Sequence, residues 1–233
     1  QALKFMEANK NNPFFLYFCP TLPHGPYHQP NDEILDYYTK KTGFPKGDAH
    51  SEDFSVPKYA SLTSRLDKEI GELVAKLKEL GILENTLIIF ASDNGSALRP
   101  DQDSYLRTGG DLRGRKTEVY EGGVKTPLIA YWKGKIEPGS KSNLVSAFWD
   151  FLPTCADLVN VKAPDNIDGI SYLPTLLGNS SQQKLHDYLY WEFPAYGGQQ
   201  AIRIDKWKGI KRDLFKGSAD LQLFDLSKDP KEL

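Results

Sequence analysis

Residues 86–95 read TLIIFASDNG, and this stretch decides the fold class of the chain. Its first seven residues have the length, the apolar character and the β-branched content of a strand buried in a parallel sheet. The run ends abruptly at Asp93-Asn94-Gly95. Ligands of an α/β sheet commonly bind beyond the carboxyl ends of its strands, so the stretch predicts a sheet with a candidate site at its edge.

The segments on either side of this strand alternate between helix and strand patterns. Apolar residues recur every three or four positions from Tyr59 to Leu80, which predicts an amphipathic helix. Two further strands are predicted at residues 13–19 and 127–132, and a second helix at residues 146–159. Residues 25–57 are rich in Pro, Gly and His without periodicity, so they predict a long loop that could wall a binding site.

After Pro164 the sequence changes to short runs that are typical of an antiparallel sheet. We therefore expect an α/β fold in which residues 1–163 form part of a mixed, mostly parallel sheet flanked by helices. Residues 164–233 are expected to form a small antiparallel-sheet subdomain. Its four predicted strands are Tyr188–Phe193, Gln200–Ile204, Trp207–Lys211 and Leu221–Leu226.

Composition and charge exclude several classes of protein. The chain has 233 residues, of which 39% are hydrophobic, enough to bury a core in one large or two small domains. The 29 basic and 31 acidic residues give a net charge of −2, which argues against a surface for nucleic acid. The longest apolar run, residues 13–19, is far shorter than the roughly 20 residues of a membrane-spanning helix.

Asp93 and Asn94 form the first candidate site. A carboxylate and an amide oxygen side by side suit a hard cation such as Ca²⁺, whereas an Asp-His pair would favour zinc or manganese. The structural alternative is an Asx turn, in which either side chain bonds nearby backbone and Gly95 adopts a positive φ.

Two more segments carry residues with possible chemistry. His24 follows the predicted strand at residues 13–19 and could act as a proton donor at the sheet edge, or be an ordinary solvated loop histidine. Residues 109–127, GGDLRGRKTEVYEGGVKTP, combine glycines that permit close approach of a ligand with basic side chains that could neutralise an anion. A solvated basic loop is the structural alternative for this segment.

Four ordered segments resemble the sulfatases of the arylsulfatase type, within the alkaline phosphatase superfamily. They are PFFLYFCPTLPHGPY, LDKEIGELVAKLKELGILENTLIIFASDNG, LRGRKTEVYEGGVKTPLIAYWKGKI and DLQLFDLSKDPKE. The resemblance implies that Asp93 and Asn94 bind the active-site calcium ion. It further implies that His24 contacts the sulfate ester near its leaving oxygen and that Lys116 binds the sulfate. These roles suit sulfuryl transfer, which spreads negative charge over oxygens that a cation, an ammonium group and a proton donor stabilise.

The same resemblance implies a sulfuric ester hydrolase that acts on sulfated carbohydrate. Sulfatases attack sulfur with a formylglycine made from a C/S-x-P-x-R motif, and no such motif occurs in this sequence. The chain is therefore expected to be the C-terminal portion of a sulfatase, inactive by itself. The resemblance also implies export to a periplasm, a cell surface or a lysosome.

Other interpretations of these residues remain. A phosphodiesterase or phosphonate hydrolase of the same superfamily would share the sheet and the metal position, although Asn94 favours a sulfatase. A relative that has lost catalysis and binds carbohydrate is a further alternative. The C-terminal sheet could line the pocket through Trp191, Glu192, Tyr196, Gln199 and Gln200, or these could be ordinary sheet residues. Cys19 is expected in the core.

Overall fold

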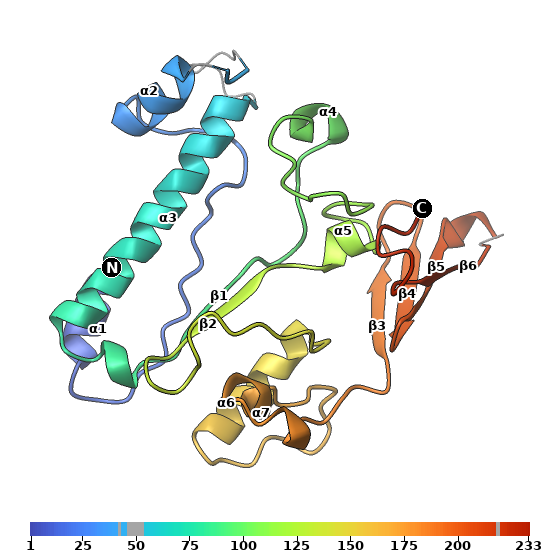
Figure 1. Ribbon diagram of the computed structural model, residues 1–233. Coiled ribbons are helices and arrows are strands. Elements are labelled where there is room, and N and C mark those ends of the chain that lie inside the picture. The colour runs from blue at the N-terminus through green and yellow to red at the C-terminus, as the bar shows by residue number, and fades with distance from the viewer. Residues whose placement is uncertain (42, 46–53, 218–219) are drawn as a thin grey trace. The chain divides into compact units, whose positions relative to one another are not determined.

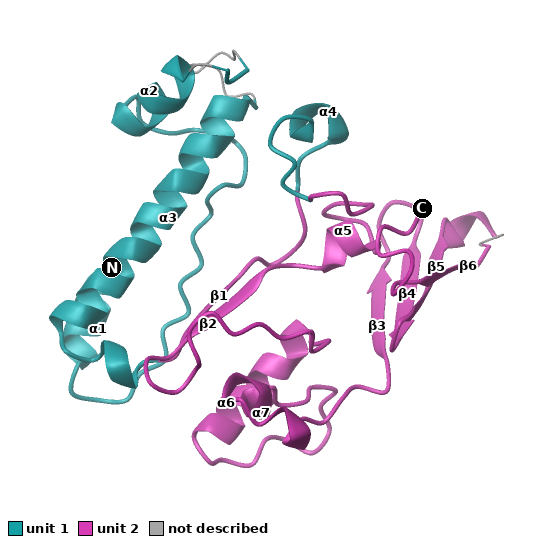
Figure 2. Cartoon of the chain, viewed as in Figure 1, with its two compact units in different colours: residues 1–86, 97–109 teal, residues 87–96, 110–233 magenta. Residues whose placement is uncertain are grey.

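The computed structural model describes residues 1–41, 43–45, 54–217 and 220–233 (Figure 1). The chain divides into two compact units (Figure 2). Unit 1 comprises residues 1–86 and 97–109, and unit 2 comprises residues 87–96 and 110–233. The expected boundary between residues 163 and 164 lies inside unit 2 and stays a prediction.

Unit 1 is helical. The helix predicted at residues 59–80 is confirmed as α3, and the chain leaves it through Gly81 at φ +72°, a left-handed conformation that suits glycine. Within the described residues no helix, α3 included, is both long and apolar enough to cross a membrane. The elements of unit 1 are α1 (Ala2–Asn9), α2 (Glu33–Lys40), α3 (Val56–Glu79), the 3-10 turn η1 (Leu83–Asn85) and α4 (Pro100–Asp103).

Two sequence predictions fail in unit 1. The stretch at residues 25–57 is not a continuous loop, because α2 forms inside it; residues 42 and 46–53 lie outside the described part. Residues 13–19 form no strand, and Tyr17 is 81% exposed. None of the strand pairs among the described residues includes this run. Cys19 is consequently exposed rather than in the core.

Asp32 explains why α2 forms. Its carboxylate caps the helix by accepting hydrogen bonds from the backbone N–H groups of Ile34 (3.1 Å) and Leu35 (3.3 Å). The same carboxylate accepts two hydrogen bonds from the Arg65 guanidinium on α3, at 2.8 and 2.5 Å. The Arg65 bonds, helped by the two backbone bonds, lower the pKa of Asp32 to about 2.

We predict that Asp32→Asn lowers the melting temperature at pH 7. A carboxyl group whose pKa is depressed in the folded state stabilises the fold above its unfolded pKa, and this contribution disappears as the pH falls from about 4 toward 2. The variant should therefore lack part of the acid-induced loss of stability, as measured by thermal unfolding between pH 2 and 7. Asp36→Asn removes only the exposed pair with Lys40 and should change little. Equal losses in both variants would contradict the prediction.

Unit 2 contains both sheets. The strand predicted at residues 127–132 is confirmed as β2, and the predicted helix at residues 146–159 forms in part, as η2 followed by α6. β1 pairs antiparallel with β2, with Ile88 opposite Tyr131, and the parallel pairing expected for β1 does not occur within the described ranges. The elements before the second sheet are β1 (Ile88–Ala91), α5 (Glu121–Val124), β2 (Leu128–Tyr131), η2 (Phe148–Asp150), α6 (Phe151–Leu158), α7 (Leu173–Leu176) and η3 (Ser180–Gln182).

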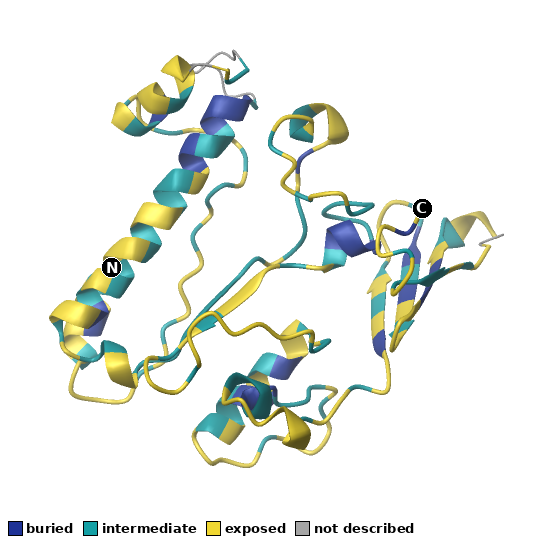
Figure 3. Cartoon of the chain, viewed as in Figure 1, coloured by how far each residue is buried: buried dark blue, intermediate teal, exposed yellow. Residues whose placement is uncertain are grey.

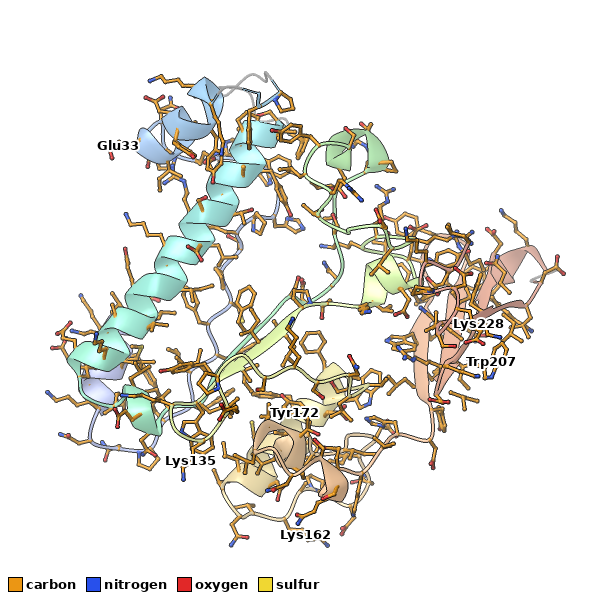
Figure 4. The ribbon with its side chains drawn as sticks, viewed as in Figure 1. Glu33, Lys135, Lys162, Tyr172, Trp207 and Lys228 are labelled. Atoms are coloured by element: carbon orange, nitrogen blue, oxygen red, sulfur yellow. The ribbon has the colours of Figure 1, made fainter. Side chains whose placement is uncertain are left out.

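The predicted C-terminal antiparallel sheet is confirmed, in the order β3-β4-β5-β6. One face packs Ala201 and Ile210 against Val119 and Tyr120, and this buried cluster joins the sheet to the α5 segment. Figure 3 shows the buried residues on α5, β4 and β5. The outer face is open to solvent: Trp207, labelled in Figure 4, is 45% exposed. The strands are β3 (Leu189–Phe193), β4 (Gln199–Ile204), β5 (Trp207–Arg212) and β6 (Gln222–Asp225), with η4 (Leu214–Lys216) between the last two.

Candidate functional site

The turn that carries Asp93 and Asn94 begins directly after β1. Ser92 Oγ donates a hydrogen bond to the carbonyl of Asn94 (2.9 Å), and Asn94 Nδ2 donates one to the carbonyl of Gly95 (3.0 Å). The Asn94 amide thus bonds nearby backbone, as the turn alternative expects, while its Oδ1 is the atom that could bind a cation. Asp93 is exposed, so its carboxylate is accessible to a ligand.

Backbone hydrogen bonds join this turn to the segment that carries Lys116. The N–H of Lys116 donates to the carbonyl of Ser96 (2.8 Å), and the N–H of Gly95 donates to the carbonyl of Gly123 (2.9 Å). The N–H of Gly122 donates to the carbonyl of Arg113 (2.7 Å) and closes the assembly. We call residues 92–96, 113–118 and 120–123 the site frame. Its backbone hydrogen bonds link the segment of the predicted metal ligands to the segment of the predicted sulfate ligand.

The glycines of the site frame are required by close packing. A Cβ atom on Gly95 would lie 1.8 Å from the carbonyl oxygen of Gly122, and one on Gly123 would lie 1.9 Å from that of Glu118. Neither glycine has a positive φ, so the expectation of a left-handed Gly95 is wrong. Within the glycine-containing segment, residues Glu121–Val124 form the short helix α5, whose glycines allow three backbone segments to touch.

A buried cluster of charged side chains contacts the site frame, and the sequence did not predict it. Lys208 Nζ on β5, which is fully buried, donates to Glu121 Oε1 (2.8 Å) and lies 3.0 Å from Glu232 Oε1. Glu232 Oε2 accepts a hydrogen bond from the N–H of Glu121 (2.6 Å), and its carbonyl accepts one from Arg113 (2.7 Å). Burial raises the pKa of Glu232 against the opposing effect of these bonds. The partners that join this cluster to Arg113 and Glu121 are 87 to 119 residues apart, so they leave no local signal in the sequence.

His24 belongs to unit 1, whereas Asp93, Asn94 and Lys116 belong to unit 2. It lies in a turn in which its N–H donates to the carbonyl of Thr21 (2.8 Å). Its ring Nδ1 lies 2.6 Å from the carbonyl oxygen of Gly25 and can only donate there. The neutral ring would therefore carry its proton on Nδ1 and keep Nε2 as an acceptor, which fixes the tautomer of this exposed side chain.

Asp93 and Asn94 supply the kind of oxygen ligands that Ca²⁺ prefers, so the donor set fits that ion. Two side chains are fewer than the 6–8 oxygens of a calcium site. Within the described residues no cluster of three or more His, Cys, Asp or Glu side chains could hold a metal by itself. The remaining ligands of such a site would have to come from elsewhere.

The residues suggested as pocket lining fall on different faces of the C-terminal sheet. Gln199 and Trp191 lie on the inner face, where Gln199 is only 1% exposed and Trp191 packs against the core. Glu192 and Gln200 lie opposite each other on the outer face. Tyr196 is 72% exposed and stacks on Phe193. Gln199 therefore contacts residues inside unit 2 and does not line an open surface.

The chain matches two family models: "Sulfatase" over residues 1–161, and "N-sulphoglucosamine sulphohydrolase, C-terminal" over residues 115–233. It is 32% identical to human arylsulfatase A over 96% of this chain and 44% of that protein. A crystal structure of Ps i-CgsB in complex with k-i-k-neocarrahexaose superposes over 100% of this chain and 48% of its own, with TM-score 0.78 and 26% identity. A structure of BT4656 in complex with its substrate D-glucosamine-2-N,6-O-disulfate covers 76% and 35%, with TM-score 0.60 and 27% identity. The chain thus spans less than half the length of these relatives.

We predict that Gly123→Ala destabilises unit 2, because the added methyl group would collide with the carbonyl oxygen of Glu118. The free energy of unfolding should fall by about 3 kcal/mol, the upper range for overpacking. Urea unfolding followed by circular dichroism would measure it. Gly71→Ala is the matched control: it lies inside α3 with nothing near its Cβ position, and should stabilise the chain by about 0.5–1 kcal/mol. A Gly123→Ala chain as stable as the parent would contradict the described packing.

Proposed function

The chain belongs to the sulfatase family, and from that premise we propose that it is the C-terminal portion of a sulfuric ester hydrolase that acts on sulfated carbohydrate. The observation that carries the proposal is the site frame, in which Lys116 N bonds to Ser96 O and Gly95 N bonds to Gly123 O. A relative whose stated substrate is a glucosamine disulfate supports the substrate class. In the complete enzyme, β1 and β2 would belong to a larger, mostly parallel sheet of the alkaline phosphatase type.

Lys116 would bind the sulfate group. Its ammonium would stabilise the negative charge that builds on the sulfuryl oxygens during transfer, and a fixed charge does so without reorganisation. Asp93 and Asn94 would hold Ca²⁺ through their side-chain oxygens, together with ligands from the rest of the enzyme. When bound, this ion would supply further positive charge beside the sulfate oxygens.

His24 would donate a proton to the leaving oxygen of the sulfate ester. Because its Nδ1 donates to the carbonyl of Gly25, proton exchange would take place at Nε2. A protonated ring could give its Nε2 proton to the departing alkoxide and so avoid release of a strong base.

The nucleophile would lie outside this chain. The sequence contains no C/S-x-P-x-R motif, so the formylglycine that attacks sulfur in sulfatases would come from the preceding part of the enzyme. The 233 residues alone would then be inactive. The proposal includes export to a periplasm, a cell surface or a lysosome, which the family membership supports.

In the complete enzyme, Lys116→Ala should lower kcat/KM for a sulfate ester by about 10²–10³-fold, the loss typical of one charge-stabilising group. Steady-state kinetics with an aryl sulfate and a sugar sulfate would measure it. Lys125→Ala is the matched control, because it removes an exposed lysine from the same segment and should leave both rates unchanged. Equal losses in the two variants would show that overall charge, rather than the position of Lys116, matters.

Peptide mass spectrometry of the complete enzyme should find a C/S-x-P-x-R peptide whose Cys or Ser has become formylglycine. Calcium, rather than zinc or manganese, should restore activity after chelation, because Asn94 replaces the histidine that softer metals favour. An unmodified Thr nucleophile with zinc dependence would point to a phosphodiesterase or phosphonate hydrolase. Sugar-sulfate binding without any nucleophile would point to a non-catalytic carbohydrate-binding relative.

A further inference from the structure

Thr117, the residue after Lys116, has an unusual backbone conformation. Its φ is +77°, a region that β-branched residues rarely adopt. The N–H of Glu118 donates to the carbonyl of Arg115 (2.9 Å), so residues 115–118 form a β-turn with Lys116 and Thr117 at its centre. Lys116 does not share the positive φ, which makes this a type II turn, and such turns favour glycine at the position of Thr117. A strained residue beside a proposed ligand needs support from its surroundings.

Gln199 supplies that support from the C-terminal sheet. Its Nε2 donates a hydrogen bond to the carbonyl oxygen of Thr117 (2.9 Å). The side chain is almost fully buried, at 1% exposure, and its Oε1 has no hydrogen-bond partner among the described residues. Burying a glutamine whose amide oxygen has no hydrogen-bond partner costs folding free energy. The side-chain bond that Gln199 makes to the turn therefore needs an explanation.

A second contact stabilises the same turn. Arg212 on β5 is the register partner of Gln199 on β4, and its guanidinium lies 3.3 Å from Glu118 Oε1. Two adjacent positions of the sheet therefore hold two adjacent residues of the turn. On the other side, the N–H of Lys116 bonds to Ser96. The Lys116 turn thus lies between the turn that carries Asp93 and the ends of the central strands β4 and β5.

We propose that Gln199 is a positioning residue for Lys116: by holding the carbonyl of Thr117 in a strained turn, it aims the lysine at the sulfate. The inference rests on the proposed function, because it assigns Gln199 to the sulfate-binding group of that same site. The C-terminal sheet then contributes to catalysis by orienting Lys116. No residue of the sheet has to touch the substrate.

The test is a double-mutant cycle between Gln199→Leu and Thr117→Gly in the complete enzyme, with kcat/KM for a sulfate ester and the melting temperature as readouts. Leucine keeps the burial but cannot donate to Thr117. Gln199→Leu should lower kcat/KM about tenfold or more, because small displacements of catalytic groups are costly. Glycine adopts a φ of +77° without strain, so in the Thr117→Gly background the same substitution should cost less than threefold.

Gln222→Leu is the matched control. Gln222 lies on the inner face of β6 and accepts a hydrogen bond from the hydroxyl of Tyr120 (2.7 Å), a contact between sheet and frame that does not reach the Lys116 turn. Both leucine variants should lower the melting temperature of the complete enzyme by similar small amounts, as expected for one lost hydrogen bond each. Only Gln199→Leu should lower kcat/KM.

Three results would overturn the inference: an unchanged kcat/KM in Gln199→Leu, the same loss in both backgrounds, or an equal loss in Gln222→Leu. A complete enzyme without any sulfate-ester turnover would instead contradict the proposed function. In that case the double-mutant cycle on melting temperature would test the contact between Gln199 and the Lys116 turn by itself. Coupling between positions 117 and 199 supports this contact, and strict additivity overturns it.

Discussion

The close approach of two backbone segments, one at Gly95 and one at Gly122 and Gly123, is the constraint on which the rest of unit 2 depends. A 2.9 Å hydrogen bond joins Gly95 N to Gly123 O, at a separation that leaves no room for a Cβ atom. This contact holds the end of β1 against α5. The turn that carries Asp93 and Asn94 can approach α5 this closely because glycine stands at these positions.

The C-terminal sheet supports this contact chemically as well as by packing. Its inner face is not purely apolar: Lys208 and Gln199 are buried there and bind Glu121 and Thr117 of the site frame. Hydrogen bonds and ion pairs are directional, so they fix the register of the frame on the sheet more strictly than apolar contacts would. The sheet thus adds directed contacts with the site frame to its apolar packing.

Local patterns in the sequence predicted the local structure well. The helical period of residues 59–80 and the four C-terminal strands needed no distant partner to be recognised. The rule that sites lie at strand ends pointed to Asp93, and the structure joins that turn to the Lys116 segment; the roles of both residues stay predictions. The strand expected at residues 13–19 failed because pairing is a property of two segments. The strain at Thr117 and the Lys208 cluster were missed for a related reason, since tertiary contacts alone define them.

The long sequence separations between the site frame and the residues that support it also affect the order of folding. Thr117 meets Gln199 across 82 residues, and Arg113 meets Glu232 across 119. Contacts of this kind require large loops to close before they repay the lost chain entropy, whereas a helix such as α3 forms from neighbours alone. The chain would therefore form its helices and hairpins early and assemble the site frame last.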